Sequence, residues 1–157
     1  MKKFVILAAL TALAACNSGT QDGQEITVEG EGADSTVSIN SGDGEMNIQS
    51  GANAKVALPL GFTAYPGAKV ISNVNADFGD GMQNTVAMNT PDSLAKVTAF
   101  YKQQATAAGV KIATEMTTPE SVLLGGETAS GAVFGLIAGP AETGGTTVNL
   151  SLQVKGK

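Results

Sequence analysis

Few side chains in this chain could carry out chemistry. It has 157 residues with no histidine, its nine basic residues are all lysine, and its only cysteine is Cys16. Nucleophilic sites with an imidazole base are therefore excluded, as are zinc sites of cysteine and histidine and a disulfide within one chain. Without arginine, and with a formal charge of −5 at pH 7, we expect no nucleic acid as a partner.

The best candidate metal ligands are Asp77 and Asp80, which lie close to glycine in residues 75–81. Oxygen ligands beside a glycine are typical of calcium loops, but Gly79 occupies the third ligand position and no bidentate glutamate follows at the required distance. Asp43 with Glu45 is a weaker version of the same pattern. We expect a polar hairpin turn at residues 77–81 and no resident metal or cofactor, with calcium at Asp77 and Asp80 as the alternative.

Residues 139–146 differ by one residue from a phosphate-binding loop of the form GxxxxGK[ST], because Gly145 stands where the lysine is required. Such a loop opens a helix, whereas the residues from Thr146 onward alternate as a strand does. Glu142 would also repel a phosphate, so the segment is predicted to be a hairpin turn. Paired carboxylates can hydrolyse a glycosidic bond, and a hydrolase that uses Asp77 or Glu142 therefore remains a further alternative.

The N-terminus has the pattern of an export signal. Two lysines precede an apolar run over residues 4–15, which is too short to span a bilayer as a helix. Leu13 is a poor residue three positions before an ordinary cleavage site, and Leu13-Ala14-Ala15-Cys16 resembles the bacterial lipobox. That resemblance implies a signal peptide over residues 1–15 and a Cys16 that carries a diacylglycerol and then an N-linked acyl chain such as palmitate. The alternative is a plainly secreted chain with a free thiol.

Removal of residues 1–15 makes the protein more acidic, because Lys2 and Lys3 leave and the formal charge changes from −5 to −7. Residues 16–24 contain no large apolar side chain and are predicted to form a lipidated tether. Asn17 follows the lipobox cysteine, and this favours the outer membrane facing the periplasm over the inner membrane.

Three short segments after the tether alternate between apolar and polar residues, at positions 25–29, 36–40 and 45–49. Each is separated from the next by glycine, aspartate or serine, which predicts a three-stranded β-meander over residues 25–50. Its apolar face would be too small to be stable alone. We therefore expect it to dock on the following domain or on a partner protein.

Residues 56–157 are predicted to form an α+β domain. Residues 90–108 have the pattern of an amphipathic helix, with Thr90 as N-cap, Pro91 at the first helical position and Gly109 after the end. One face of this helix contains Leu94, Val97, Tyr101, Ala105 and Ala108. Strands at 68–75, 82–89, 110–113, 121–124, 132–138 and 146–154 complete a ββαββββ order. The expected fold class is an antiparallel sheet covered by one helix and preceded by the small meander.

The chain resembles a group of small bacterial envelope lipoproteins. The resemblance lies in residues 58–62, in residues 65–70 ("YPGAKV"), in Thr90-Pro91-Asp92-Ser93 and in Phe100-Tyr101-Lys102, and it covers about residues 25–157. It implies a similar fold and location, and it carries over no functional residue. We therefore expect a lipid-anchored, non-catalytic binding or structural protein that meets the membrane through Cys16 and has a possible envelope protein partner. The alternatives are a small-ligand or calcium-binding periplasmic module and the carboxylate hydrolase.

Overall fold

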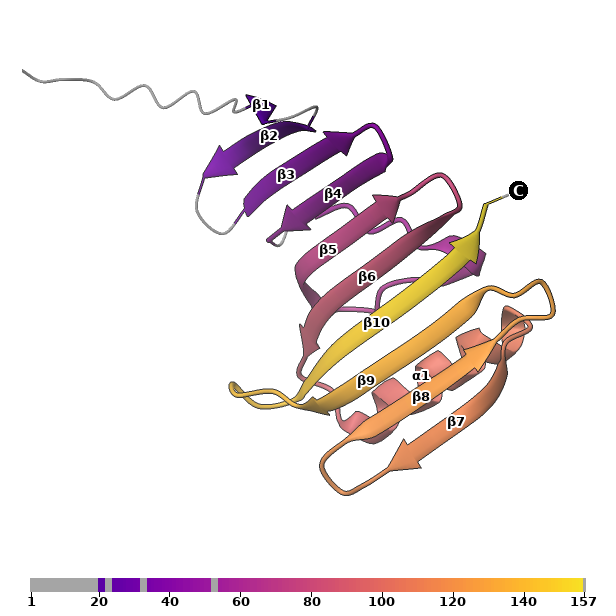
Figure 1. Ribbon diagram of the computed structural model, residues 1–157. Helices are drawn as coiled ribbons and strands as arrows, with labels where there is room; N and C mark the ends of the chain where they lie inside the picture. Colours follow the sequence, from indigo (N-terminus) through magenta and orange to yellow (C-terminus); the bar gives the residue numbers. More distant parts are fainter. Residues whose placement is uncertain (1–19, 22–23, 32–33, 52–53, 157) are drawn as a thin grey trace, which may run out of the picture.

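The computed structural model describes residues 20–21, 24–31, 34–51 and 54–156. Its strands form one antiparallel sheet in the order β1-β2-β3-β4-β5-β6-β10-β9-β8-β7, with the N-terminal strands at one end and α1 at the other (Figure 1). The strands are β1 (Thr20–Gln21), β2 (Gln24–Glu31), β3 (Asp34–Ser41), β4 (Gly44–Ser50), β5 (Lys69–Asp77), β6 (Gly81–Thr90), β7 (Lys111–Thr117), β8 (Val122–Glu127), β9 (Val133–Pro140) and β10 (Thr146–Lys155). The helices are the 3-10 turn η1 (Pro59–Gly61) and α1 (Leu94–Ala107).

The predicted fold class, an α+β domain preceded by a separate meander, is wrong. β4 pairs with β5 from Glu45 opposite Asp77 to Ser50 opposite Ser72, so β2–β4 continue the sheet rather than stack on it. The helix covers only one end of the resulting sheet, where it packs mainly against β9 and β7 (Figure 1). The alternation within each strand is local, whereas the choice of neighbour depends on a pairing between distant segments that no local pattern specifies.

The two faces of the sheet differ in what covers them. The covered face, which includes Val86, Met88 and Leu150, lies beneath α1 and the connection over residues 54–68. The core is built there and comprises Phe62, Tyr65, Val86, Met88, Val97, Tyr101, Ala105, Val110, Val122, Leu124, Phe134, Leu136, Ala138, Val148, Leu150 and Leu152. The other face, here called the open face, has polar residues such as Thr85 and Asn149 at its centre, together with exposed apolar residues towards both ends.

α1 begins later than the sequence predicts. Thr90 is the last residue of β6 and pairs with Thr146, so its backbone is committed to the sheet, and the N-cap is Ser93. The predicted apolar face is confirmed, since Val97, Tyr101 and Ala105 are buried and Leu94 and Ala108 are partly buried. Gly109 ends the helix as predicted, with φ of 73°.

Candidate ligand groove

A groove of about 480 Å³ lies between α1 and the β7–β8 hairpin. Most of its lining is apolar or carries a hydroxyl group, and its only charged lining residues are Lys102 and Glu115. The residues that line it are Leu94, Ala95, Thr98, Ala99, Lys102, Glu115, Thr117, Thr118, Pro119 and Val122. A smaller hollow of about 250 Å³ shares Leu94 and Pro119 with this groove and extends towards Gly145 and Thr146. The groove and the smaller hollow together, here called the channel, therefore meet at Leu94 and Pro119 beside the start of α1.

A β-bulge determines which residues of β7 face this groove. The register shifts between Ile112, which pairs with Gly126, and Thr114, which pairs with Gly125. One extra residue in a strand moves every later side chain to the other face. Glu115 and Thr117 therefore face α1, while Met116 turns to the open face and is 61% exposed. Without the bulge, the pairing of Ile112 with Gly126 would continue to place Thr114 opposite Leu124, where the charged Glu115 lies.

Lys102 and Glu115 form an ion pair beside the groove, with 2.5 Å between Lys102 Nζ and Glu115 Oε1. Both side chains are substantially exposed, so the pair stabilises the fold by at most about 1 kcal/mol. Its effect on the groove is geometric and electrostatic, because it places one positive and one negative group at the margin of an apolar surface. A ligand with an apolar body and one polar end matches this arrangement.

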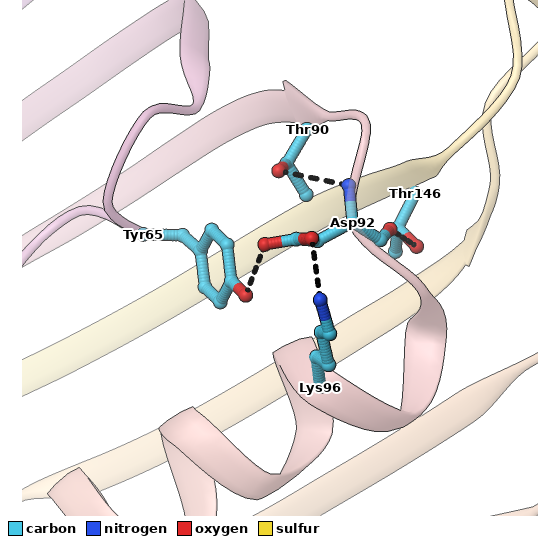
Figure 2. Close-up of polar contacts among 5 residues, drawn as sticks. All are labelled: Tyr65, Thr90, Asp92, Lys96 and Thr146. Carbon is cyan, nitrogen blue, oxygen red and sulfur yellow. Dashed lines mark hydrogen bonds and ion pairs between the residues drawn. The ribbon is translucent and has the colours of Figure 1, made fainter.

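The start of α1 is held by a cluster of polar contacts (Figure 2). Tyr65 Oη donates to Asp92 Oδ2 at 2.8 Å, and Lys96 Nζ donates to Asp92 Oδ1 at 3.1 Å. Asp92 N donates to Thr90 Oγ1 at 3.3 Å, and Thr146 Oγ1 donates to Asp92 O at 2.8 Å. One residue thus ties the helix start to the connection over residues 54–68, to β6 and to β10.

The hydrogen bond between Tyr65 and Asp92 shifts the pKa of both groups. It favours the ionised carboxylate, so the Asp92 pKa is held below 3.8, with a second contribution from the hydrogen bond of Lys96. The same bond, together with burial and the charge of Asp92, raises the Tyr65 pKa above 10.0. At neutral pH Tyr65 is therefore neutral and donates its hydrogen bond to the ionised carboxylate of Asp92. This bond helps to fix the position of the helix start.

The β9–β10 turn lies directly against this cluster. A Cβ on Gly145 would meet Thr90 O at 2.1 Å and Pro91 Cα at 2.7 Å, so only glycine allows this approach. Within the same turn, Ala141 N donates to Gly145 O at 3.2 Å, and β10 begins at Thr146. The predicted hairpin turn before a strand is confirmed, although it occupies only residues 141–145, because Gly139 and Pro140 belong to β9 and Thr146 to β10.

The predicted calcium residues lie at a different end of the molecule from the groove. Asp77 Oδ1 accepts a hydrogen bond from Gly79 N at 2.9 Å in the β5–β6 turn, and Asp77 pairs with Glu45 of β4. Among the described residues, no group of three or more cysteine, aspartate or glutamate side chains is arranged to hold a metal ion. Calcium binding at Asp77 and Asp80 stays a prediction. Cys16 lies outside the described residues.

The two carboxylates named for a hydrolase do not lie together. Asp77 pairs with Met82, which lies opposite Val154 near the end of β10, whereas Glu142 lies in the turn before Thr146 at its start. The eight residue steps from Thr146 to Val154 span about 26 Å in a strand. The carboxyl groups of a glycosidase are about 5–10 Å apart, so Asp77 and Glu142 cannot act on one bond.

The groove cannot be recognised in the sequence, because its parts come from distant segments. Thr117, Thr118 and Pro119 signal a turn after β7, but only the folded chain places this turn beside α1. Lys102 does not belong to the predicted apolar face of the helix, and its partner Glu115 comes from the strand that follows the helix. A basic and an acidic residue 13 positions apart are not recognisable as a pair without knowledge of the fold.

Among family models, one described as "START domain-like" matches residues 70–133, which is less than half of the chain. The matched residues begin at Val70 in β5 and include β6, α1, β7 and β8, and they therefore include every residue that lines the groove. The match is compatible with a ligand-binding fold and a role that is not catalytic. Neither the curated proteins nor the solved structures provide a match.

Proposed function

We propose that this protein binds a small, mainly apolar ligand in the groove between α1 and the β7–β8 hairpin and does not transform it chemically. The observation that carries this proposal is the composition of the groove, which is lined by apolar side chains and threonines and has a single ion pair, Lys102 with Glu115, at its margin. Binding pockets are typically apolar with a few placed polar groups. The START domain-like match over the same elements supports this function.

A binding role agrees with the chemistry that the groove offers. Lys102 and Glu115, its only charged lining residues, are partners of each other. A general acid or base must lie within hydrogen-bond reach of the reacting atom, whereas each of these two groups is engaged by the other at the margin of the groove. The threonines can donate or accept hydrogen bonds, which suits recognition of a polar end.

Ligand binding in the groove can be tested by a substitution that fills the groove with a bulky side chain. Ala99 lines the groove on α1 and is exposed, so Ala99→Trp should fill the groove at little cost to the fold. We expect titration with the neutral fluorescent probe N-phenyl-1-naphthylamine to show a loss of affinity of about tenfold or more, equivalent to at least 1.4 kcal/mol. The probe is chosen because it is apolar and does not depend on charge attraction.

Ala107→Trp is the matched control, because Ala107 is exposed on the same helix and does not line the groove. This variant should bind the probe as the wild type does. Equal affinity of Ala99→Trp, Ala107→Trp and the wild type would show that the probe binds elsewhere and would refute the groove as the site.

We further propose that the binding domain is exported and lipid-anchored at Cys16, preferentially in the outer membrane facing the periplasm, where an envelope protein is a possible partner. The support is the Leu13-Ala14-Ala15-Cys16 pattern after a short apolar run. No helix within residues 54–156 or the shorter described segments is long and apolar enough to span a bilayer. Cys16→Ser should move the protein from the membrane fraction to the soluble fraction, whereas retention in the membrane would refute the anchor.

A further inference from the structure

The open face of β2–β4 is apolar although no described segment covers it. The strand register places six apolar side chains on this face, and we call them the anchor-side patch: Ile26, Val28, Val37, Ile39, Met46 and Ile48. Val28 is 58% exposed and Ile26 is 37% exposed, while the others are partly buried by their neighbours. Contiguous exposed apolar residues on a folded protein mark a surface that meets another apolar body.

The acidic residues of the same strands lie on the opposite face. Glu25, Glu29 and Asp34 alternate with the patch residues on β2 and β3, and Glu45 alternates with Met46 on β4. An apolar face free of carboxylates can approach a lipid surface, because its own charges stay in water on the other side.

The patch also lies close to the proposed lipid anchor. Three residues separate Cys16 from Thr20, and Thr20 pairs with Glu25, which precedes Ile26. Four residue steps of extended chain span at most about 14 Å. A lipid on Cys16 would therefore hold the β1–β2 edge of the sheet beside the bilayer, with the anchor-side patch within reach of its surface.

We propose that the anchor-side patch lies against the lipid bilayer as a second, non-covalent membrane contact. The proposal rests on lipidation of Cys16, because two exposed aliphatic side chains alone would bind a bilayer only weakly. A second copy of the chain fits less well. A stable dimer buries about 800 Å² on each partner, and two exposed and four partly buried side chains offer much less.

This contact would determine the orientation of the whole molecule. Ten strands at about 4.8 Å spacing place β7 roughly 43 Å from β1 across the sheet. The ligand groove lies at the β7 end on the covered face, whereas the anchor-side patch lies at the β2 end on the open face. Contact of the patch with lipid would hold the groove away from the bilayer and open to water.

The experiment uses the lipidated full chain with a single labelled thiol. Because Cys16 is the only natural cysteine and would be blocked by lipid, Val28→Cys supplies one free thiol for a nitrobenzoxadiazole label. The labelled protein is placed in vesicles of phosphatidylethanolamine and phosphatidylglycerol that contain brominated phospholipid. We expect the label at position 28 to emit at shorter wavelength and to lose roughly half of its intensity to bromine, as at the headgroup–acyl boundary.

Two control positions separate contact of this face from mere proximity to the anchor. Thr27→Cys places the label on the next residue but on the opposite face, and Val133→Cys places it at a comparably exposed valine of the open face on β9. Both labels should keep the emission they have in water. Equal quenching at positions 27 and 28, or no quenching at position 28 in protein shown by mass to be lipidated, would overturn the proposal.

The remaining outcomes also decide the question. A short-wavelength emission at position 28 without vesicles, accompanied by a dimer mass in sedimentation, would assign the face to a second copy and overturn the lipid contact. A mass without lipid on Cys16 would refute the anchor alone. The same three labels on the Cys16→Ser chain mixed with vesicles would then test whether the anchor-side patch contacts lipid. Preferential quenching at position 28 would support that contact, and equal emission at all three positions would overturn it.

Discussion

Asp92 connects several separate parts of this protein. Its carboxylate accepts hydrogen bonds from Tyr65, 27 positions earlier, and from Lys96 one helical turn later, while its backbone carbonyl accepts from Thr146. Leu94, which lines both parts of the channel, follows two positions later. The position of the groove wall therefore depends on this one carboxylate and its donors.

Tyr65→Phe should make the protein less stable at neutral pH and less sensitive to acid. The folded-state pKa of Asp92 is below 3.8, so its contribution to stability is present above pH 3.8 and is lost as pH falls through the lower, folded-state pKa. The difference in Tm between wild type and Tyr65→Phe, no more than a few degrees at neutral pH, should therefore shrink as pH falls below 3.8 in thermal scans followed by circular dichroism.

Tyr101→Phe is the matched control for this substitution. Tyr101 is also a buried tyrosine, but its hydroxyl contacts Thr63 O and Met88 Sδ at 3.5 Å and no carboxylate. Its Tm difference from the wild type should stay constant in the same acid range. An unchanged difference for Tyr65→Phe across that range would contradict the coupling between Tyr65 and Asp92.

At the scale of elements, the end of α1 shows how a local signal determines a boundary. Gly109 has φ of 73°, Val110 N donates to Ala105 O at 2.9 Å, and Gly109 N donates to Thr106 O at 3.1 Å. These bonds form a Schellman motif, which satisfies the last helix carbonyls and turns the chain towards β7. The motif thereby brings the second wall of the groove alongside the helix.

Gly109→Ala should lower the free energy of unfolding by about 1 kcal/mol, because an L-residue is strained in the left-handed region. A Cβ at this position meets no atom within 4 Å, so the cost is conformational rather than steric. Urea unfolding measures the change, and Gly109→Asn should cost less because asparagine tolerates this conformation. Gly42→Ala, where a Cβ also has open space and φ is not positive, should not be destabilising, and an equal loss in both alanine variants would contradict this explanation.

At the scale of the whole molecule, the sheet is continuous but the core is not evenly distributed. Every core residue and every partly buried residue packed against the core lies between Val56 and Leu152. The boundary between β4 and the rest of the sheet is polar on the covered face, where the buried Asn73 donates to Lys55 O at 3.0 Å and Asn84 donates to Asn75 Oδ1. The N-terminal strands therefore extend the sheet without contributing to the core.

A chain that begins at residue 54 should consequently still unfold in one cooperative thermal transition. Its Tm should be lower than that of the chain without residues 1–16, because removal of β4 leaves the backbone of β5 unpaired at a new edge. Differential scanning calorimetry of the two chains makes the comparison. Loss of the cooperative transition in the shorter chain would show that β1–β4 are required for the fold.

The sequence by itself determined the features that depend on neighbouring residues. Alternation predicted the strands around residues 26, 37, 48 and 150, helical periodicity predicted the buried side of α1, and Gly109 marked its end. These features follow from short-range sterics and from a period of two or 3.6 residues, both of which are visible in a short window. The lipid anchor at Cys16 also comes from sequence alone and stays a prediction.

Only the tertiary structure decided which segments meet. The pairing of β4 with β5 overturned the predicted fold class, the bulge in β7 placed Glu115 beside Lys102, and the commitment of Thr90 to β6 moved the helix start to Ser93. Each depends on which distant segments pair and in which register, and a short stretch of sequence does not contain the information that distinguishes one pairing from another. The groove and the anchor-side patch result from that pairing, because each is formed by residues that become neighbours only when the strands have paired in the sheet.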